Sequence, residues 1–131
     1  MAQPEIAPDG FAAEIGVEWL SLDPDDARAR IAVEPRHLQP YGIVHGGVYA
    51  ALAESLTSVA TYAAVHEQGM VSMGQANDTT FMRPIGAGYI NASATPRHRG
   101  RTTWVWDVEI TDDEGRVCAL ARTTIAVRPG R

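Results

Sequence analysis

The chain has 131 residues, with 16 acidic and 11 basic side chains and a formal net charge of −5. This length suits a single domain over residues 1–131. A domain of this size buries roughly two thirds of the surface that its unfolded chain exposes, so it needs no staples. The single cysteine, Cys118, excludes an internal disulfide framework and a cysteine-rich zinc site. The acidic balance disfavours nucleic acid as a partner.

No segment predicts insertion into a membrane or export. The sequence has no uninterrupted apolar run of about 18 residues, so we expect no membrane-spanning helix. The first ten residues have neither a basic start nor an apolar stretch, which argues against a signal peptide. We therefore expect a cytoplasmic protein in which residues 1–10 are flexible.

All 11 basic residues are arginines, and they are unevenly distributed. Residues 1–80 carry three arginines and 11 acids, whereas residues 81–131 carry eight arginines and five acids. Arginine makes planar, bidentate contacts with phosphate. The basic last third is therefore compatible with a compact ligand that carries phosphate groups.

The first part of the chain predicts a helical turn, two strands and a loop. Residues 11–16 can form a short helical turn, and residues 17–22 and 27–33 read as strands. The acidic, proline-containing segment 23–26 is the turn between these strands. Two prolines and a glycine in residues 34–44 predict a loop.

One long helix is predicted from Gly46 to about Glu67. The segment is rich in alanine and leucine, which favour helices. Its apolar residues lie almost all around the cylinder, so we expect this helix to be largely buried. Gly69 follows as a stop signal.

The second half of the chain predicts four strands joined by tight turns. The strands are expected at residues 70–82, 88–96, 102–111 and 116–127, with turns at 97–101 and 112–115. The fold class is therefore α+β, with one antiparallel sheet covering one long helix. A single sheet wrapped on a single helix leaves exposed edges, which favours oligomerisation.

The junction between the loop and the long helix is the first candidate site. Gly46 and Gly47 let a ligand approach the backbone closely. The first turn of a helix has unpaired N–H groups and a partial positive charge, which can stabilise a developing oxyanion. The alternative is a plain flexible helix start.

Glu54 is the second candidate, because it is the only acid between Glu34 and Glu67 and lies within the apolar helix. A carboxylate there is costly unless it is satisfied or functional. The alternative is a half-exposed or ion-paired glutamate on a seam of the helix. Ser58 lies one turn later on the same face, where its hydroxyl can also bond back to the helix backbone.

The spacing of these candidates predicts a shared site. Gly46 and Glu54 are eight residues apart. On a helix this corresponds to roughly 12 Å, so both cannot contact one small reacting group. If both act on it, they come from two subunits, which predicts a homodimer.

These residues resemble the motif of the hotdog-fold acyl-CoA thioesterases. In that motif a glutamine precedes a His-Gly pair, followed at fixed spacing by an acid and then by serine or threonine. It is matched here by Gln39, His45, Gly46, Glu54 and Ser58. The sequence is most similar to the PaaI-like group, and within it to the 4-hydroxybenzoyl-CoA and 1,4-dihydroxy-2-naphthoyl-CoA thioesterases. Some relatives have aspartate on the helix, and glutamate here favours the aroyl-CoA branch.

The resemblance covers nearly the whole chain and implies hydrolysis of an acyl-CoA, with an aromatic acyl group, by a tetramer of hotdog dimers. No cofactor or metal is implied. The N–H of Gly46 would polarise the thioester carbonyl, and His45 would orient that carbonyl or hold the loop. Glu54 of the other subunit would act as general base or nucleophile. Gln39 and Ser58 would position the water or the carboxylate.

The resemblance also implies substrate-binding residues in the last third of the chain. Asn77 and Arg83 match a segment that the family places on the strand after the helix. The turn Arg99-Gly100-Arg101-Thr102 suits the phosphates of the coenzyme. The alternative for these arginines is a solvated basic hairpin.

Other functions stay open at this point. A non-catalytic acyl-CoA binding or sensing protein on the same fold would have no need of Glu54. A hotdog hydratase or dehydratase needs a histidine and an acid placed for proton transfer from carbon, and His45 followed by two glycines lacks that arrangement. The spacings of the four histidines fit no helical pair of metal ligands, which disfavours a metal site built from His37, His45, His66 and His98.

Overall fold

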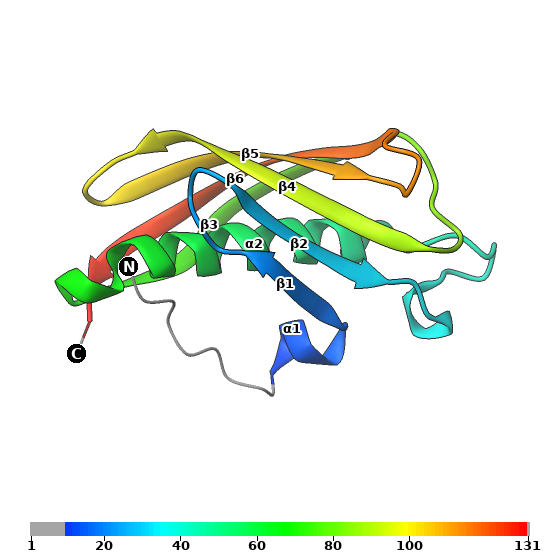
Figure 1. Cartoon of the computed structure of the whole chain (residues 1–131), viewed down its shortest axis with the longest axis horizontal. Helices are drawn as coiled ribbons and strands as arrows, with labels where there is room; N and C mark the ends of the chain where they lie inside the picture. The colour runs from blue at the N-terminus through cyan, green and yellow to red at the C-terminus, as the bar shows by residue number, and fades with distance from the viewer. Residues whose placement is uncertain (1–9, 131) are drawn as a thin grey trace.

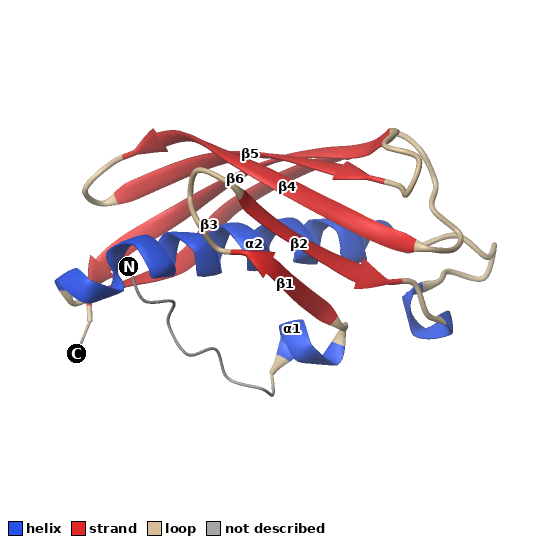
Figure 2. Ribbon diagram, viewed as in Figure 1, coloured by secondary structure: helices blue, strands red, loops and turns tan. Residues whose placement is uncertain are grey.

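A six-stranded antiparallel sheet curls around one long helix in the computed structural model, which describes residues 10–130 (Figures 1 and 2). The flexibility expected for residues 1–10 falls, except for Gly10, outside these described residues. The elements in chain order are α1 (Phe11–Glu14), β1 (Val17–Ser21), β2 (Ala27–Ala32), η1 (Pro35–His37), α2 (Gly46–Val65), η2 (His66–Gln68), β3 (Met70–Phe81), β4 (Tyr89–Arg99), β5 (Thr103–Thr111) and β6 (Val117–Pro129). This order confirms the α+β prediction.

The strands are arranged β1-β2-β4-β5-β6-β3, and all neighbours are antiparallel. β3 follows α2 and η2 directly in the chain. It pairs with β6 and forms one edge of the sheet. Its outer edge has no partner strand in the described chain. β3, which runs beside α2, is therefore one of the two exposed edges of the sheet, and β1 is the other (Figure 1).

Local signals explain both ends of α2. His45 is the N-cap residue, with extended backbone angles and a side chain that accepts a hydrogen bond from the N–H of Gly47. Gly69 ends the helical segment at a φ of 76°, in the left-handed region that favours glycine. Two local expectations were wrong. Residues 35–37 of the predicted loop form the short helix η1, because Pro35 begins it and Glu34 and His37 form a capping box. Residues 97–99 of the predicted turn continue strand β4, where they pair with β5.

The length and apolar composition of residues 46–68 alone would suit a membrane span. Half of the 18-residue window within it that meets this test is buried within the protein, as expected for the core helix of a sheet-wrapped fold. Leu52 and Leu56 are fully buried on the face of α2 that packs against the sheet.

Polar groups within this packed face are paired with one another. The indole nitrogen of Trp106 donates to the Thr61 hydroxyl at 2.9 Å, and the Thr123 hydroxyl donates to that of Thr57 at 2.8 Å. Thr57 in turn donates to the carbonyl of Ala53 at 2.9 Å. Buried hydroxyls are costly unless they are paired, so these contacts favour one rotation of α2 against the sheet.

Candidate functional site

The N-terminus of α2 is a well-defined donor site. The N–H of Gly47 donates to Nδ1 of His45 at 2.8 Å, and the N–H of Val48 donates to the His45 carbonyl at 2.9 Å. The N–H of Gly46 has no acceptor among the described residues. Because Nδ1 of His45 accepts a hydrogen bond, its neutral ring carries the proton on Nε2. Two donors, the N–H of Gly46 and Nε2–H of His45, are thus available at this helix start.

The loop that leads into α2 is held by a buried histidine. Nδ1 of His37 accepts from the N–H of Glu34 at 2.9 Å, so Nε2 donates to the carbonyl of Ile15 at 2.7 Å. The His37 carbonyl accepts from the N–H of His45 at 2.9 Å. Three separate segments are therefore joined at His37, beside the loop that carries Gln39.

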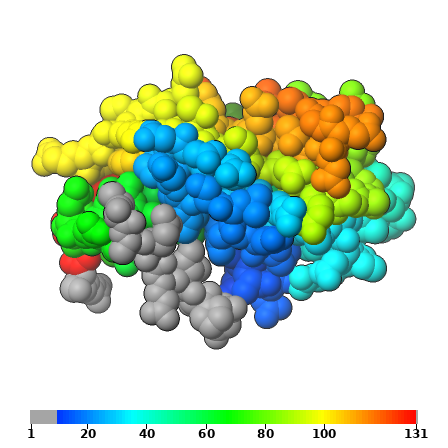
Figure 3. Space-filling view, in the orientation of Figure 1, coloured from blue at the N-terminus to red at the C-terminus, as the bar shows by residue number. Residues whose placement is uncertain are grey.

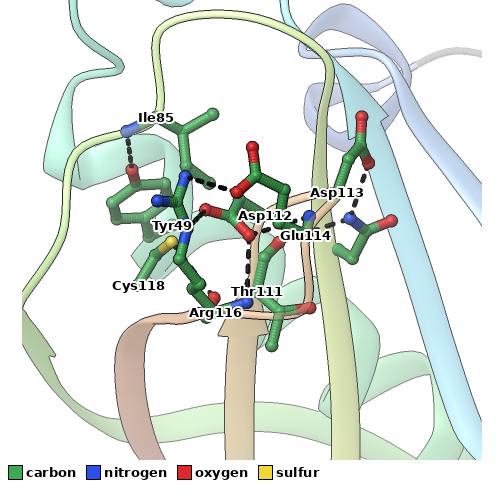
Figure 4. A network of polar contacts seen from close by, with 9 residues as sticks. Tyr49, Ile85, Thr111, Asp112, Asp113, Glu114, Arg116 and Cys118 are labelled. Atoms are coloured by element: carbon green, nitrogen blue, oxygen red, sulfur yellow. Dashed lines mark hydrogen bonds and ion pairs between the residues drawn. The ribbon is translucent and has the colours of Figure 1, made fainter.

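The loop between β3 and β4 forms the opposite wall of the site. The N–H of Ile85 donates to the Tyr49 hydroxyl at 3.1 Å (Figure 4). The Ile85 carbonyl accepts from the N–H of Val44 at 2.8 Å. The carbonyl of Cys118 accepts from the N–H of Arg83 at 3.0 Å. Burial raises the pKa of the Tyr49 hydroxyl and that of the Cys118 thiol, so both stay neutral.

The turn between β5 and β6 carries a polar network of its own beside Tyr49 and Cys118 (Figure 4). The Asp112 carboxylate accepts hydrogen bonds from the backbone and the guanidinium of Arg116 and from the N–H of Glu114. Burial opposes the ionisation of Asp112, but these hydrogen bonds outweigh it and hold the pKa of its carboxyl below the usual range. The turn predicted at residues 112–115 is thus stabilised by its own side chains.

A pocket of about 530 Å³ opens between the two loops. It brings together four of the predicted site residues and two aromatic rings, namely Gln39, His45, Gly46, Arg83, Tyr49 and Phe81. The rings of Tyr49 and Phe81 are tilted, with centroids 6.1 Å apart. A side chain at position 46 would begin 2.9 Å from the Phe81 ring, so glycine is what lets this ring pack against the helix start.

Glu54 and Ser58 lie outside this pocket, on the stripe of α2 that faces β3. Asn77 of β3 donates from Nδ2 to the carbonyl of Ala50 at 2.9 Å, and the Ser72 hydroxyl donates to the carbonyl of Ser58 at 2.8 Å. The Glu54 carboxylate lies over Gly74, where an added Cβ would be 2.7 Å from Oε2. No hydrogen bond joins the Ser58 hydroxyl to Glu54 within residues 10–130.

Glu54 is exposed, so it occupies a seam of the helix rather than its buried face. The seam is open because β3 is the last strand of the sheet and its middle residues are exposed. Sequence reasoning did not single out Gly74. A glycine inside a strand is a recognised signal of close approach by another group, and it could have identified this position.

The predicted phosphate-binding turn is at the other end of the molecule. Arg99, Gly100 and Arg101 line a second pocket of about 510 Å³ beside the C-terminal end of α2. A helix of 20 residues is about 30 Å long, so one chain does not bring this turn to Gly46. Figures 1 and 3 show the turn (yellow) and the loop before α2 (cyan) at opposite ends of the long axis. Arg99 pairs with Asp25, and the Thr102 carbonyl accepts from Arg128.

No three potential metal ligands from histidine, cysteine, aspartate or glutamate gather anywhere in residues 10–130. His37 and His45 serve in the hydrogen bonds described above, and His66 follows α2. His98 lies in β4, beside Gly100.

Comparison with known proteins identifies the family. The sequence profile of the Thioesterase superfamily matches residues 41–119. The protein Rv1847 of Mycobacterium tuberculosis is 45% identical over 117 residues, which are 88% of this chain and 84% of the relative. The proofreading thioesterase EntH of Klebsiella pneumoniae is 34% identical over 117 residues, which are 89% of this chain and 85% of the relative.

Solved structures agree with this result. The structure of Rv1847 superposes with a TM-score of 0.87 at 41% identity and covers 92% of this chain and 98% of that one. Thioesterase HI1161 of Haemophilus influenzae superposes with a TM-score of 0.85 at 33% identity, over 90% of this chain and 82% of that one. The chain belongs to the thioesterase superfamily, and its curled sheet around one central helix is the hotdog fold of that family.

Proposed function

We propose that the protein hydrolyses an acyl-CoA thioester with an aromatic acyl group, releasing the free acid and CoA. The observation that carries this proposal is the pocket in which the free N–H of Gly46 lies beside the rings of Tyr49 and Phe81. Membership of the thioesterase superfamily supplies the reaction class, thioester hydrolysis. An aromatic acyl group would pack against these rings and leave its carbonyl at the helix N-terminus.

The carbonyl would be polarised by donors that are already in place. The N–H of Gly46, aided by the helix dipole, would donate a hydrogen bond to the carbonyl oxygen as negative charge develops on it, and Nε2–H of His45 would orient the carbonyl. Gln39 lines the same pocket and would position the attacking water. The reaction would need only water and these side chains, without a cofactor.

The carboxylate would come from a second copy of the chain. Ala50 lies midway between Gly46 and Glu54, four residues from each. A two-fold axis beside Ala50 would run the two α2 helices antiparallel and place Gly46 of each chain opposite Glu54 of the other. The small residues Gly47, Ala50 and Ala51 would let the helices approach closely. Glu54 would then act as general base on water or as nucleophile, with Ser58 near the carboxylate.

The open edge of β3 supports this arrangement. Asn77 contacts Ala50, so an axis beside Ala50 would also pass close to the middle of β3. Antiparallel pairing of the two β3 edges would then join the two sheets and satisfy their free backbone groups. We propose further that two such dimers form a tetramer, as the resemblance to the PaaI-like group suggests.

The same two-fold symmetry would bring the basic turn at residues 99–102 into the site. In antiparallel helices, the C-terminal end of one α2 lies beside the N-terminal end of the other. Arg99, Gly100, Arg101 and Thr102 of one chain would then lie on the side of the partner's pocket. Together with Arg83 of that pocket, they would bind the phosphates of the coenzyme. A free CoA ester as substrate also agrees with the cytoplasmic location expected from the sequence.

A steady-state screen tests this function. Benzoyl-type, phenylacetyl and fatty acyl-CoAs would be compared by release of the CoA thiol. We expect kcat/KM for the best aromatic acyl-CoA to exceed that for fatty acyl-CoAs by about tenfold or more, because one well-filled apolar pocket discriminates on this scale. Equal and very low values for all substrates, together with tight binding, would instead indicate an acyl-CoA sensing protein.

A further inference from the structure

We infer that Asn77 is a positioning residue that fixes the direction of the Glu54 carboxylate, and that Thr79 fixes Asn77 in turn. The inference rests on the proposed function, because it concerns the carboxylate that the proposal places in the reaction. It differs from the sequence-based expectation for Asn77, which was contact with the substrate.

The orientation of the Asn77 amide follows from its two firm hydrogen bonds. Nδ2 lies 2.9 Å from the carbonyl oxygen of Ala50, and the Thr79 hydroxyl lies 2.6 Å from Oδ1. A backbone carbonyl can only accept, so the amide nitrogen must face Ala50 and the amide oxygen must face Thr79. Only this orientation of the amide satisfies both contacts.

The second proton of the amide is then available to Glu54. Nδ2 of Asn77 lies 3.4 Å from Oε1 of Glu54, which is longer than a usual N–H···O hydrogen bond and makes this the weakest of the amide's contacts. The other oxygen, Oε2, lies over Gly74, where no side chain intervenes. One carboxylate oxygen is therefore held by the amide, and the other is left for water or for the thioester carbonyl.

The face of β3 that meets α2 suits this role. Asn77 and Thr79 lie on the inner face of β3, in register with the buried residues Thr123 and Ala121 of β6. Asp78, the acid nearest to Asn77 in β3, points to the other face of the sheet and is in register with Arg122. Within residues 10–130, Glu54 has no ion-pair partner, and the side chains around it on α2, β3 and β6 are uncharged. A neutral amide, rather than a charge, sets its direction.

The substitution Asn77→Asp tests this inference, because it keeps the shape and replaces the amide by a second carboxylate. Two carboxylates at hydrogen-bond distance resist joint ionisation. The acidic limb of the pH profile of kcat/KM should therefore move to higher pH by about one unit or more. We also expect kcat at neutral pH to fall by about tenfold or more. The matched control is Asp78→Asn on the other face of β3, which should leave the limb in place.

Thr79→Val provides a second test that adds no charge. Without the hydroxyl, the Asn77 amide keeps only its hydrogen bond to the Ala50 carbonyl and is held less firmly, so kcat should fall about threefold to tenfold while KM stays unchanged. Thr79→Ser should restore kcat. A wild-type pH profile in Asn77→Asp, or a wild-type kcat in Thr79→Val, would overturn the inference. If those variants are normal while Glu54→Gln is inactive, the inference fails and the proposed function stands. If Glu54→Gln is itself active, the proposed function fails.

Discussion

The two long faces of α2 have opposite characters. One face packs into the curled sheet, with Leu52 and Leu56 fully buried and the hydroxyls of Thr57, Thr61 and Thr123 paired. The other face runs along the open edge at β3 and carries Gly46, Ala50, Glu54 and Ser58 at intervals of four residues.

This difference separates stability from chemistry on a single helix. The packed face is complete within one chain, because its apolar groups are covered and its polar groups have partners. The face beside β3 carries an exposed carboxylate, which only a long hydrogen bond from Asn77 holds within residues 10–130, and the N–H of Gly46, which has no acceptor among those residues. Substitutions on the packed face should therefore change stability, and substitutions on the face beside β3 should change activity.

Glu54→Gln should have the largest effect on activity. It keeps the size of the side chain and removes the charge, so we expect hydrolysis of acyl-CoA to fall at least about 100-fold, the usual scale for losing a catalytic acid or base. The melting temperature should be unchanged, because Glu54 is exposed. Glu67→Gln, at another exposed glutamate just after the helix, is the matched control. Near-normal turnover in Glu54→Gln would contradict the assignment.

Gly46→Pro should have the next largest effect, because it deletes the proposed oxyanion donor while keeping the helix. Proline is accepted at the first helical position, and His45 already has the extended angles, φ −64° and ψ 133°, that a residue before proline adopts. The control Gly46→Ala crowds Phe81 in the same way but retains the N–H. We expect kcat to be about 100-fold lower in the proline variant than in the alanine variant. Equal rates would exclude this N–H from catalysis.

Thr57→Val should show the opposite behaviour, since it lies on the packed face. It leaves the Thr123 hydroxyl without its acceptor, which costs about 1–3 kcal/mol of unfolding free energy. Chemical denaturation should detect this loss, while kcat/KM should stay within about threefold of the wild type if the fold is intact. The double variant Thr57→Val/Thr123→Val, which removes both partners, should recover part of the stability. A loss of activity without a loss of stability would show that the two faces are not separate.

Tyr49→Phe should have the smallest effect, because it removes one hydrogen bond between α2 and the wall of the pocket. We expect a loss of about 1 kcal/mol and a rise in KM that exceeds any change in kcat. The pKa of Tyr49 is raised by burial, so its contribution is complete below about pH 10, where unfolded tyrosine begins to ionise. The wild type should therefore lose stability above this pH, and Tyr49→Phe should lose less. Parallel pH curves for the two proteins would argue against a raised pKa.

Much of this arrangement could be predicted from the sequence. The alanine- and leucine-rich composition of residues 46–67 predicted α2, and the change to β-branched and aromatic residues predicted the four later strands. The spacing from Gly46 to Glu54 predicted that one chain does not complete the site, and the structure places the two residues in different surroundings along the helix.

The remaining features depend on contacts between segments that are distant in sequence. His37 was considered only as a metal ligand, yet it joins three segments through hydrogen bonds that no local pattern reveals. The pairing of β3 with β6 places Gly74 beneath Glu54, and this follows from the sheet order rather than from any motif. The distance of Arg101 from Gly46 likewise becomes apparent only when the helix is placed between them.

The most direct test of a site shared between two chains is a mixture of two inactive variants. Gly46→Pro and Glu54→Gln would be unfolded together, refolded at equal concentrations and assayed against the separate variants. Random pairing makes about half of the dimers mixed, and each mixed dimer has one site with both wild-type residues. We therefore predict recovery of about one quarter of wild-type activity per chain. No recovery, with mixed dimers demonstrated by a tag on one variant, would contradict the shared site.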